Sequence, residues 1–537
     1  MTVTRSRTSA PAADATSARV LILGTGFAGI GMAAQLKRAG MDDFLVLERA
    51  TDVGGTWRDN TYPGCACDVP SLLYSFSFAQ NPEWSDTFSP QPEILDYLRT
   101  VAADEGVIPH VRFGRTVQGA RWDDERRVWQ VETSDGTYEG QVVVSGVGGL
   151  SEPKNPDIAG LDRFEGTTFH TARWDHEHDL AGERVAVIGT GASSIQVVPA
   201  IQPTVGQLTL FQRTPPWIME RRSRPFSRTE RFLFRHLPGF QRLVRSSIYW
   251  AREIPVLGFA FRPKILQRAE RLARAHMEKA VVDVDLREKL TPDYTMGCKR
   301  ILLSNDYFPA LTQPNVTLET SGIAEIREHS IVTADGTEHP VDTIIFGTGF
   351  QATEMPAAHY IWGKDGVKLA DQWADGASAY LGTTIHNFPN LFFIVGPNTG
   401  LGHTSMVFMI ESQVAYILEA LRSMEGAGAA SIEVRDEVES SFDAEIQERL
   451  APTVWNTGGC KSWYLDPSGR NSLLWPTFTF VFRNRTRRFD PTDYRVVAAG
   501  AAVEAGAAVA AVASMPDGPA ADPDDPAGDR TLATAAD

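Results

Sequence analysis

The sequence of 537 residues predicts an α/β fold with two Rossmann-like dinucleotide-binding domains and a helical insert. Two glycine-rich loops support this prediction, Gly-Thr-Gly-Phe-Ala-Gly at 24–29 and Gly-Thr-Gly-Ala-Ser-Ser at 189–194. Each loop follows a short apolar run and precedes a helix-like stretch, the order in which a strand, a turn and a helix bind a pyrophosphate. Between 223 and 290 the pattern changes to long amphipathic segments rich in Arg, Leu and Phe, which predict helices.

The residue that ends the second strand of each unit distinguishes the two cofactors. Glu48 lies 24 residues after Gly24, where a carboxylate accepts a hydrogen bond from a ribose 2′-OH, as FAD or NAD requires. Arg213 lies 24 residues after Gly189, where a guanidinium forms charge-assisted hydrogen bonds with a 2′-phosphate. The first loop therefore suits FAD and the second suits NADPH, and the chain is expected to move electrons between them. Ser194 replaces the usual third glycine of the second loop, a departure that its small side chain makes tolerable.

The remaining patterns divide the chain into segments. Strand patterns return near residue 323 and end in a Thr-Gly-Phe turn at 348–350, and from about 381 the chain rejoins the first domain. The FAD domain is therefore predicted to be discontinuous. The predicted segments are a disordered N-terminal tail at 1–17, an FAD domain at 18–152 and 381–495, an NADP domain at 153–222 and 323–380, a helical insert at 223–322, and a mobile C-terminal tail at 496–537.

Composition excludes several kinds of partner. The formal net charge is −16 and no basic tract is dense enough to predict nucleic-acid binding. The first 17 residues lack the apolar core of a signal peptide, so a cytoplasmic protein is expected. Residues 496–515 are rich in Ala, Gly and Val, but Glu504 interrupts them and alanine transfers weakly into lipid. No stable membrane insertion is predicted.

The four cysteines, at 65, 67, 298 and 460, are predicted to be reduced thiols. The Cys-Ala-Cys spacing at 65–67 is too close for a normal disulfide or a zinc knuckle. It also lacks the CxxC or CxxxxC spacing of the flavin disulfide reductases. A non-oxygenating flavoprotein reductase, one alternative function, would need such a redox dithiol or an acceptor partner.

A segment between the two loops reads Phe164-x-Gly166-x3-His170-x3-Trp174-Asp175. It matches every fixed position of FxGxxxHxxxW(P/D), so the chain resembles the type I Baeyer–Villiger monooxygenases, which oxygenate ketones with FAD and NADPH. The related N- and S-oxygenating flavin monooxygenases usually have Tyr or Phe where this chain has Trp. The match therefore favours ketone oxygenation over that alternative, and the histidine and tryptophan are expected to link the two domains rather than to take part in the chemistry.

A second motif of the same family, (A/G)GxWxxxx(F/Y)P(G/M)xxxD, is complete between Gly54 and Asp68. The segment from 459 to 471 resembles the branch of the family that acts on open-chain and aryl ketones. The resemblance covers roughly residues 18–495. It implies a ketone and O2 as substrates, an ester or lactone as product, and a monomer or weak homo-oligomer.

The family chemistry implies two catalytic residues, Arg300 and Asp68. NADPH reduces FAD, O2 adds at flavin C4a, and the resulting peroxide must remain an anion to attack the ketone carbonyl. Arginine keeps its charge whatever its burial, so Arg300 would stabilise that anion and the tetrahedral adduct while Asp68 orients it. A non-enzymatic nucleotide-binding module would have no use for this pair. Lys299 would bind the NADP 2′-phosphate together with Arg213 and Thr214.

The resemblance also implies the cofactor-binding residues. For FAD they are Gly24, Gly26, Phe27, Gly29, Glu48, Thr56, Trp57, Asp68, Tyr74 and Val117. For NADP they are Thr190, Gly191, Ala192, Ser193, Ser194, Gln196, Arg213, Thr214, Lys299, Arg300 and Trp463. The sequence leaves two roles open for His403, structural or lining the pocket.

Overall fold

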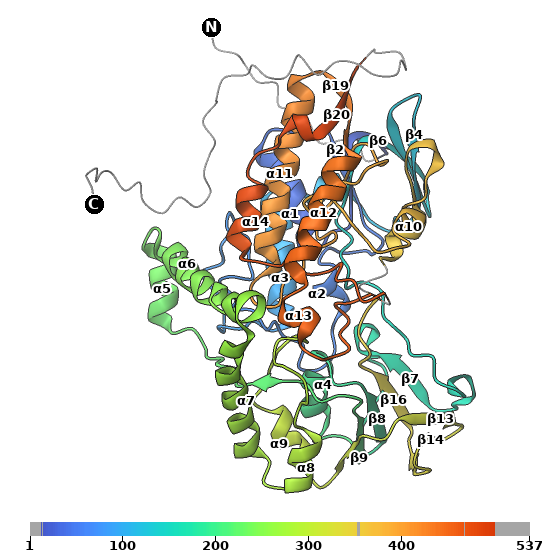
Figure 1. Cartoon of the computed structure of the whole chain (residues 1–537), viewed down its shortest axis with the longest axis vertical. Helices are drawn as coiled ribbons and strands as arrows, with labels where there is room; N and C mark the ends of the chain where they lie inside the picture. Colours follow the sequence, from blue (N-terminus) through green and yellow to red (C-terminus); the bar gives the residue numbers. More distant parts are fainter. Residues whose placement is uncertain (1–11, 13, 352–354, 467, 500–537) are drawn as a thin grey trace.

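Two sheets with parallel strands organise the chain in the computed structural model, which describes residues 12, 14–351, 355–466 and 468–499 (Figure 1). The first sheet has the strand order β17-β4-β5-β6-β1-β2-β3, with β18 paired to β6. Its strands are β1 (Ser17–Leu23), β2 (Phe44–Leu47), β3 (Val111–Arg112), β4 (Val117–Asp123), β5 (Val128–Thr133), β6 (Gly136–Ser145), β17 (Ile361–Trp362) and β18 (Leu391–Phe393).

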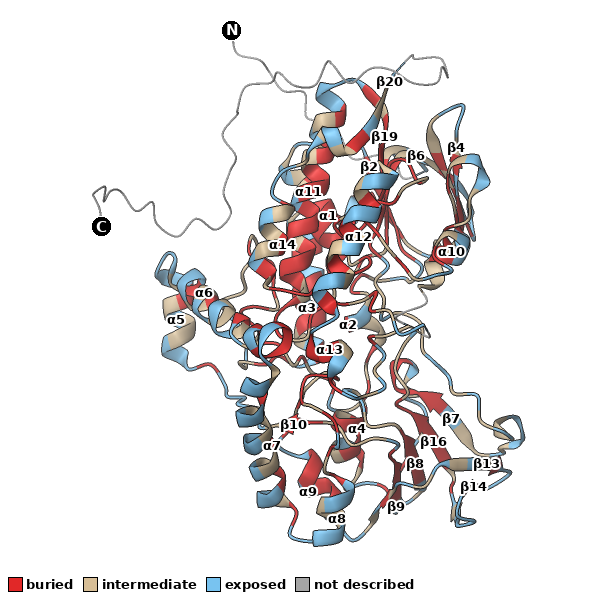
Figure 2. Cartoon of the chain, viewed as in Figure 1, coloured by how far each residue is buried: buried red, intermediate tan, exposed pale blue. Residues whose placement is uncertain are grey.

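Strand β1 shows why this sheet is buried on both faces. Val20 and Ile22 belong to one apolar core, and Leu21 and Leu23 belong to another on the opposite face, as the two-residue period of a strand dictates. Helices α1 and α11 pack together over the first face, where most of their residues are buried (Figure 2). The helices of this unit are α1 (Phe27–Arg38), α2 (Thr56–Asp59), α3 (Gln91–Asp104), α10 (Leu369–Gln372), α11 (Met406–Gly426), α12 (Asp436–Leu450), α13 (Val454–Thr457) and α14 (Thr479–Arg485).

The second sheet is parallel throughout, with the order β12-β9-β8-β16-β7. Its strands are β7 (Thr167–His170), β8 (Arg184–Ile188), β9 (Gln207–Phe211), β12 (Val316–Glu319) and β16 (Thr343–Phe346), and a small antiparallel sheet of β13 (Ile323–Arg327), β14 (Ser330–Thr333) and β15 (Glu338–Pro340) lies beside it. Helices α4 (Ser194–Ile201) and α9 (Tyr307–Leu311) contact one another in this unit. The predicted pair of Rossmann-like units is therefore present.

The helices predicted between the two units are also present. They are α5 (Arg228–His236), α6 (Phe240–Glu253), α7 (Leu266–Ala280) and α8 (Val284–Lys289), and the short pair β10 (Ile218–Met219) and β11 (Leu302–Leu303) brackets them. In Figure 1 the first three of these helices form one margin of the molecule. Within the described residues, no helix combines the length and the apolarity that crossing a membrane requires.

Three strands pair across the predicted segment boundaries. Strand β12 lies inside the predicted insert at 223–322 but pairs with β9 of the second sheet. Strand β17 lies inside the predicted NADP segment at 323–380 but pairs with β4 of the first sheet. Strand β20 (Tyr494–Ala498) enters the predicted tail and pairs with β19 (Ala429–Val434). Local sequence patterns identify a strand but not the sheet edge with which it pairs.

Most of both predicted tails, 1–11 and 500–537, lies outside the described residues.

Candidate functional site

Four glycines near the carboxyl end of β1, Gly24, Gly26, Gly29 and Gly55, form a surface without side chains. Gly24 has a φ of +91°, and a Cβ on Gly29 would lie 1.9 Å from the Gly24 carbonyl oxygen. A second glycine turn packs against this loop, since a Cβ on Gly55 would lie 2.9 Å from Gly26 Cα. Helix α1 begins at Phe27 with no side-chain cap on its first N–H groups. Backbone donors at an uncapped helix N-terminus are the chemistry that a pyrophosphate requires, so the loop fits FAD.

Glu48 follows β2 directly, as predicted, and it also binds the first glycine loop. The residue is 3% exposed, and its carboxylate accepts hydrogen bonds from the Thr25 backbone N–H at 3.0 Å and the Thr25 hydroxyl at 2.6 Å. Arg58 lies 3.0 Å from its other oxygen. The Arg115 N–H donates to the Glu48 carbonyl at 2.8 Å, and Val117 begins β4 two residues later. The two hydrogen bonds from Thr25 therefore let Glu48 hold the glycine loop in position.

The aromatic residues predicted to contact FAD lie together beside the same loop. Trp57 donates its indole N–H to the Tyr74 hydroxyl at 3.0 Å, and the rings of Phe27 and Tyr74 are 5.0 Å apart. Thr56 begins the short helix α2 that carries Trp57. Burial raises the pKa of Tyr74, so its hydroxyl remains a neutral hydrogen-bonding group.

The second loop, between β8 and α4, is closed against β16. Gly189 has a φ of +110°, and a Cβ there would lie 2.5 Å from the Gly347 carbonyl oxygen. A Cβ on Gly347 would in turn lie 1.9 Å from the Ser194 hydroxyl, which is buried. The hydroxyl thus occupies the space that a third glycine would leave, and Gly347 makes room for it. Thr190 donates to the Thr214 carbonyl at 3.0 Å, and Gly191, Ala192 and Ser193 complete the turn.

Two cations predicted to bind a 2′-phosphate come together at this loop. Burial lowers the pKa of Lys299, and the charge of Arg213 lowers it further, so the two side chains lie within electrostatic reach of one another. The Lys299 ammonium is 5.1 Å from the centre of the Tyr294 ring. Neither cation forms an ion pair with any carboxylate of the described residues. Neighbouring cations without a bound acid fit the dianionic phosphate that distinguishes NADP from NAD.

Arg300 contacts Asp68 of the first unit. Its Nε and Nη2 donate to the two carboxylate oxygens at 2.8 and 2.7 Å. The two side chains are 32% and 25% exposed, so the pair remains open on one side. The charge of Asp68 raises the pKa of Arg300 further above its ordinary value. The structure thus joins the two residues that the family resemblance selects as catalytic.

Two residues near this pair were missed by sequence reasoning. Burial lowers the pKa of Arg252 on α6, and the charges of Asp68 and Arg300 both act on it. Tyr464 is 1% exposed, burial raises its pKa to about 12, and its hydroxyl has no partner among the described residues. Tyr464 follows the predicted site residue Trp463 directly in the chain, so its position could have indicated it. No sequence motif surrounds Arg252 that would have indicated its place near the pair.

Trp463, Gln196 and His403 occupy different surroundings. Trp463 is 48% exposed and its ring lies 4.6 Å from that of Tyr464. The Gln196 amide donates to the Ala66 carbonyl at 3.0 Å, which joins α4 to the loop that carries Asp68. His403 is buried and its Nε2 is 3.2 Å from a carboxylate oxygen of Glu253 on α6.

The Phe164–Asp175 motif lies where the two units meet. His170 ends β7, and its Nδ1 accepts a hydrogen bond from the Ala172 N–H at 3.0 Å. Burial lowers the pKa of His170 to about 4, so the ring is neutral near pH 7. Trp174 packs against an apolar core that includes residues of both units, with its ring 5.0 Å from that of Phe169 on β7. Just beyond it, His176 is 2.7 Å from the Thr61 hydroxyl of the first unit.

The prediction that all four cysteines are reduced is wrong for two of them. Cys298 and Cys460 form a disulfide with an S–S distance of 2.09 Å. It joins the residue before Lys299 to the loop that carries Trp463. The two cysteines are 162 residues apart, so sequence spacing could not reveal the pair. Cys65 and Cys67 are free, as predicted, and both are buried.

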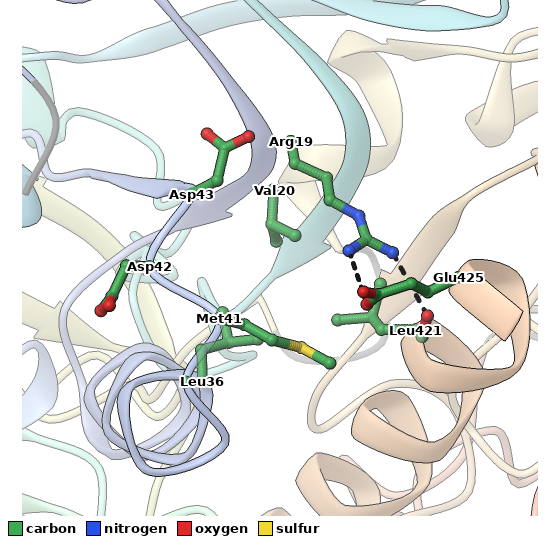
Figure 3. Close-up of a pocket in the computed structure, with 9 residues that line it drawn as sticks. Arg19, Val20, Leu36, Met41, Asp42, Asp43, Leu421 and Glu425 are labelled. Atoms are coloured by element: carbon green, nitrogen blue, oxygen red, sulfur yellow. Dashed lines mark hydrogen bonds and ion pairs between the residues drawn. The ribbon is translucent and has the colours of Figure 1, made fainter. Parts of the chain in front are cut away.

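A cavity elsewhere in the first unit is unrelated to this site. It has a volume of about 170 Å³ and includes the Arg19 guanidinium, which is 3.1 Å from a Glu425 carboxylate oxygen (Figure 3). Arg19 is near the start of β1, whereas both glycine loops lie at carboxyl ends of strands. Ligands of open α/β sheets bind at the carboxyl ends, so the glycine loops define the candidate site.

Comparisons with known proteins agree with this geometry. Residues 21–228 match the pyridine nucleotide-disulphide oxidoreductase family. The chain is 53% identical over 480 residues to a Baeyer–Villiger monooxygenase of Streptomyces coelicolor, covering 89% of this chain and 92% of the relative. It is 50% identical over 486 residues to a Baeyer–Villiger monooxygenase of Pseudomonas aeruginosa, covering 90% of this chain and 92% of the relative.

Solved structures give the same result. OTEMO in complex with FAD and NADP has a TM-score of 0.81 and 28% identity, covering 89% of this chain and 99% of its own. Cyclohexanone monooxygenase from Rhodococcus sp. Phi1 bound to NADP+ has a TM-score of 0.81 and 28% identity, covering 90% of this chain and all of its own. The likeness therefore extends over both units of the fold.

Proposed function

The chain belongs to the Baeyer–Villiger monooxygenases, and from that premise we propose how its own residues divide the reaction. It is an NADPH-dependent flavin monooxygenase that inserts one oxygen atom of O2 beside a ketone carbonyl, giving an ester or lactone. The relatives support this reaction rather than N- or S-oxygenation. The single observation that supports the residue roles most strongly is the bidentate Asp68–Arg300 pair between the two cofactor loops.

The first loop would hold FAD, which when bound supplies electron storage and the activation of O2. Gly24, Gly26 and Gly29 would present backbone N–H groups to its pyrophosphate. Trp57 and Tyr74, fixed to one another by a hydrogen bond, would form a rigid wall beside the flavin. Glu48 would accept a hydrogen bond from the ribose hydroxyl while it keeps its hydrogen bond with Thr25.

The second loop would hold NADP through charge. Arg213 and Lys299 lie within electrostatic reach of one another and are free of ion pairs with described carboxylates, so a 2′-phosphate would relieve their mutual repulsion. Thr190 and Ser193 lie at the turn before α4, where the pyrophosphate would bind. NADH, which has no 2′-phosphate, would leave the repulsion in place.

Arg300 would bind the oxygen anion that attacks the ketone. Its guanidinium has five N–H donors, and Asp68 occupies two of them, so three remain for an oxygen anion and for the tetrahedral adduct. Because both bonds to Asp68 are already formed, the cation needs no reorientation when negative charge develops. Asp68 would thus act through Arg300, as a positioning residue.

Three coarser features complete the proposal. The FAD unit would comprise the first sheet with β17 and β20, the NADP unit the second sheet with β12, and the helical insert the residues between β10 and β11. The enzyme would work in the cytoplasm as a monomer or weak homo-oligomer. Its substrates would be open-chain or aryl ketones, as the motif at 459–471 indicates.

Product analysis tests the proposed reaction and its substrate range. Purified enzyme would be supplied with NADPH, O2 and a panel of linear, cyclic and aryl ketones, with a thioether as comparison. Esters from linear and aryl ketones are expected in proportion to the NADPH consumed. Oxidation of the thioether without any ester would overturn the assignment to ketones.

A further inference from the structure

Helix α6 carries apolar side chains on two faces. On its inner face Phe240, Val244, Ile248 and Tyr249 pack partly buried against the core, and its fully buried residues are Gln241, Arg245 and Glu253, all polar or charged. Arg245 donates to the carbonyls of Leu72 at 2.6 Å and Ser75 at 2.9 Å, so polar contacts anchor the helix to the first unit. The outer face of an ordinary amphipathic helix is polar, so the apolar residues on the outer face of α6 need an explanation.

These outer apolar residues form one stripe. Leu243, Trp250 and Ile254 are 68%, 56% and 63% exposed, and they recur at helical spacing. The stripe continues through η4 (Leu257–Phe261), where both end residues are exposed, to Ile265 at 53%. Figure 2 shows that the outer side of α6 and α7 is exposed along this margin of the molecule. Contiguous exposed apolar residues of this size mark an interaction surface.

Cations without acidic partners flank the stripe. Arg242 adjoins Leu243 in the chain, Arg262 and Lys264 lie between its last members, and Arg268 and Arg271 follow on α7; all five are exposed. Within the described residues, none of the five forms an ion pair. Residues 228–280 contain twelve Lys or Arg against four Asp or Glu, a net charge of +8 in a chain whose total is −16. The insert is therefore a basic, apolar arm on an acidic protein.

An exposed apolar stripe flanked by exposed cations favours one kind of binding partner. A second copy of the chain seated on the same face would place two faces of net positive charge against one another, which is unfavourable. An anionic lipid surface satisfies both features, because acyl chains accept the apolar stripe and lipid phosphates accept the cations. We propose that α6, η4 and the start of α7 dock this enzyme onto an anionic bilayer surface, with the stripe at the level of the lipid headgroups.

Vesicle co-sedimentation of the full-length FAD-loaded chain tests the proposal directly. Binding is expected to vesicles of phosphatidylcholine with phosphatidylglycerol, to be weak on phosphatidylcholine alone, and to fall as salt is raised. The triple variant Leu243→Ser, Trp250→Ser, Ile254→Ser should bind at least about tenfold more weakly. Tyr360→Ser, which removes a 50% exposed ring far from the stripe, should bind like the wild type.

Charge reversal gives an independent arm of the same test. Lys264→Glu with Arg268→Glu should weaken binding to the anionic vesicles by about tenfold or more. The matched control, Arg422→Glu with Arg495→Glu, makes the same change in net charge away from the insert and should have little effect. Flavin content and melting temperature report whether each variant is folded, and the single variant Leu243→Ser replaces the triple one if that fails.

Two outcomes would overturn the proposal. One is the absence of binding to anionic vesicles by the folded wild type at low salt. The other is a concentration-dependent dimer, measured by sedimentation velocity, that Leu243→Ser abolishes, because the stripe would then be covered by a second copy. Neither readout depends on ketone turnover, so the proposed reaction stands or falls separately.

Discussion

Asp68 and Arg300 belong to different parts of the fold, yet their side chains form two parallel hydrogen bonds of 2.8 and 2.7 Å. Asp68 follows the glycine turn that packs on the FAD loop, and Arg300 follows the lysine that lies near Arg213 at the NADP loop. The pair therefore ties the geometry of one cofactor site to that of the other.

Asp68→Ala tests whether the carboxylate acts only through Arg300. The guanidinium would keep its charge but lose the two bonds that orient it, so ester yield per NADPH should fall while NADPH oxidation continues. The loss should be smaller than that caused by removing Arg300 itself. Product and cofactor are measured together by gas chromatography and absorbance; a loss of NADPH oxidation of the same size would show that Asp68 serves hydride transfer instead.

Arg213→Ala tests the charge at the second loop. Loss of one charge-assisted contact with the 2′-phosphate should cost about 1.5–3 kcal/mol, which raises the KM for NADPH roughly 10- to 150-fold. The KM for NADH should barely change, because NADH has no phosphate to lose. Arg222→Ala, which removes an arginine whose side chain is 86% exposed, is the matched control. Equal use of NADPH and NADH by the wild type would contradict the assignment.

The contact between Gly347 and Ser194 predicts a rescue experiment. Gly347→Ala would place a methyl group 1.9 Å from the Ser194 hydroxyl, and such overpacking should cost about 1–3 kcal/mol of stability. Adding Ser194→Gly should restore most of the loss, because it removes the obstructing side chain. Thermal melts of the two single variants and the double variant measure the coupling. Additive losses in the double variant would show that the two residues do not obstruct one another.

His170 predicts a pH dependence of stability. Its pKa falls from 6.5 in the unfolded chain to about 4 in the folded state. Between pH 4 and pH 6.5 the folded state therefore binds fewer protons than the unfolded state. The stability is fully present above pH 6.5 and is lost as pH falls toward 4, by about 2 kcal/mol at pH 5. His170→Asn keeps an acceptor for the Ala172 N–H but cannot titrate, so its melting temperature should fall less between pH 7 and 5. Parallel curves for the two proteins would remove His170 as the cause.

The sequence predicted those parts of the site that depend on local pattern. The strand, glycine loop and helix from 17 to 38 form because an apolar run, a turn and a helical segment follow one another directly. The opposite charges of Glu48 and Arg213 occupy the expected ends of their strands. Long-range relationships were beyond this reasoning. The Cys298–Cys460 disulfide and the pairing of β17 with β4 each join segments whose proximity no spacing rule encodes.

Helix α6 shows a second limit. Apolar residues at helical spacing predict the helix correctly, and Val244 and Ile248 pack inward as that pattern predicts. The structure also buries Arg245 and Glu253, because backbone carbonyls and Thr479 satisfy them. It leaves Leu243 and Trp250 exposed. The presence of Arg252 near the Asp68–Arg300 pair could not be predicted from composition.

The central claim, that Arg300 stabilises the oxygen anion, is tested most directly by ester formed per NADPH consumed in Arg300→Ala. Hydride transfer needs only the two cofactor sites, so NADPH should still be oxidised, with its electrons recovered as hydrogen peroxide. Ester formation should fall by at least about 10²–10³-fold, since no other described residue replaces the bidentate pair with Asp68. Arg300→Lys keeps a charge without the planar fork and should retain part of the coupling. Wild-type ester yield from Arg300→Ala would contradict the account and leave the oxygen anion without its assigned cation.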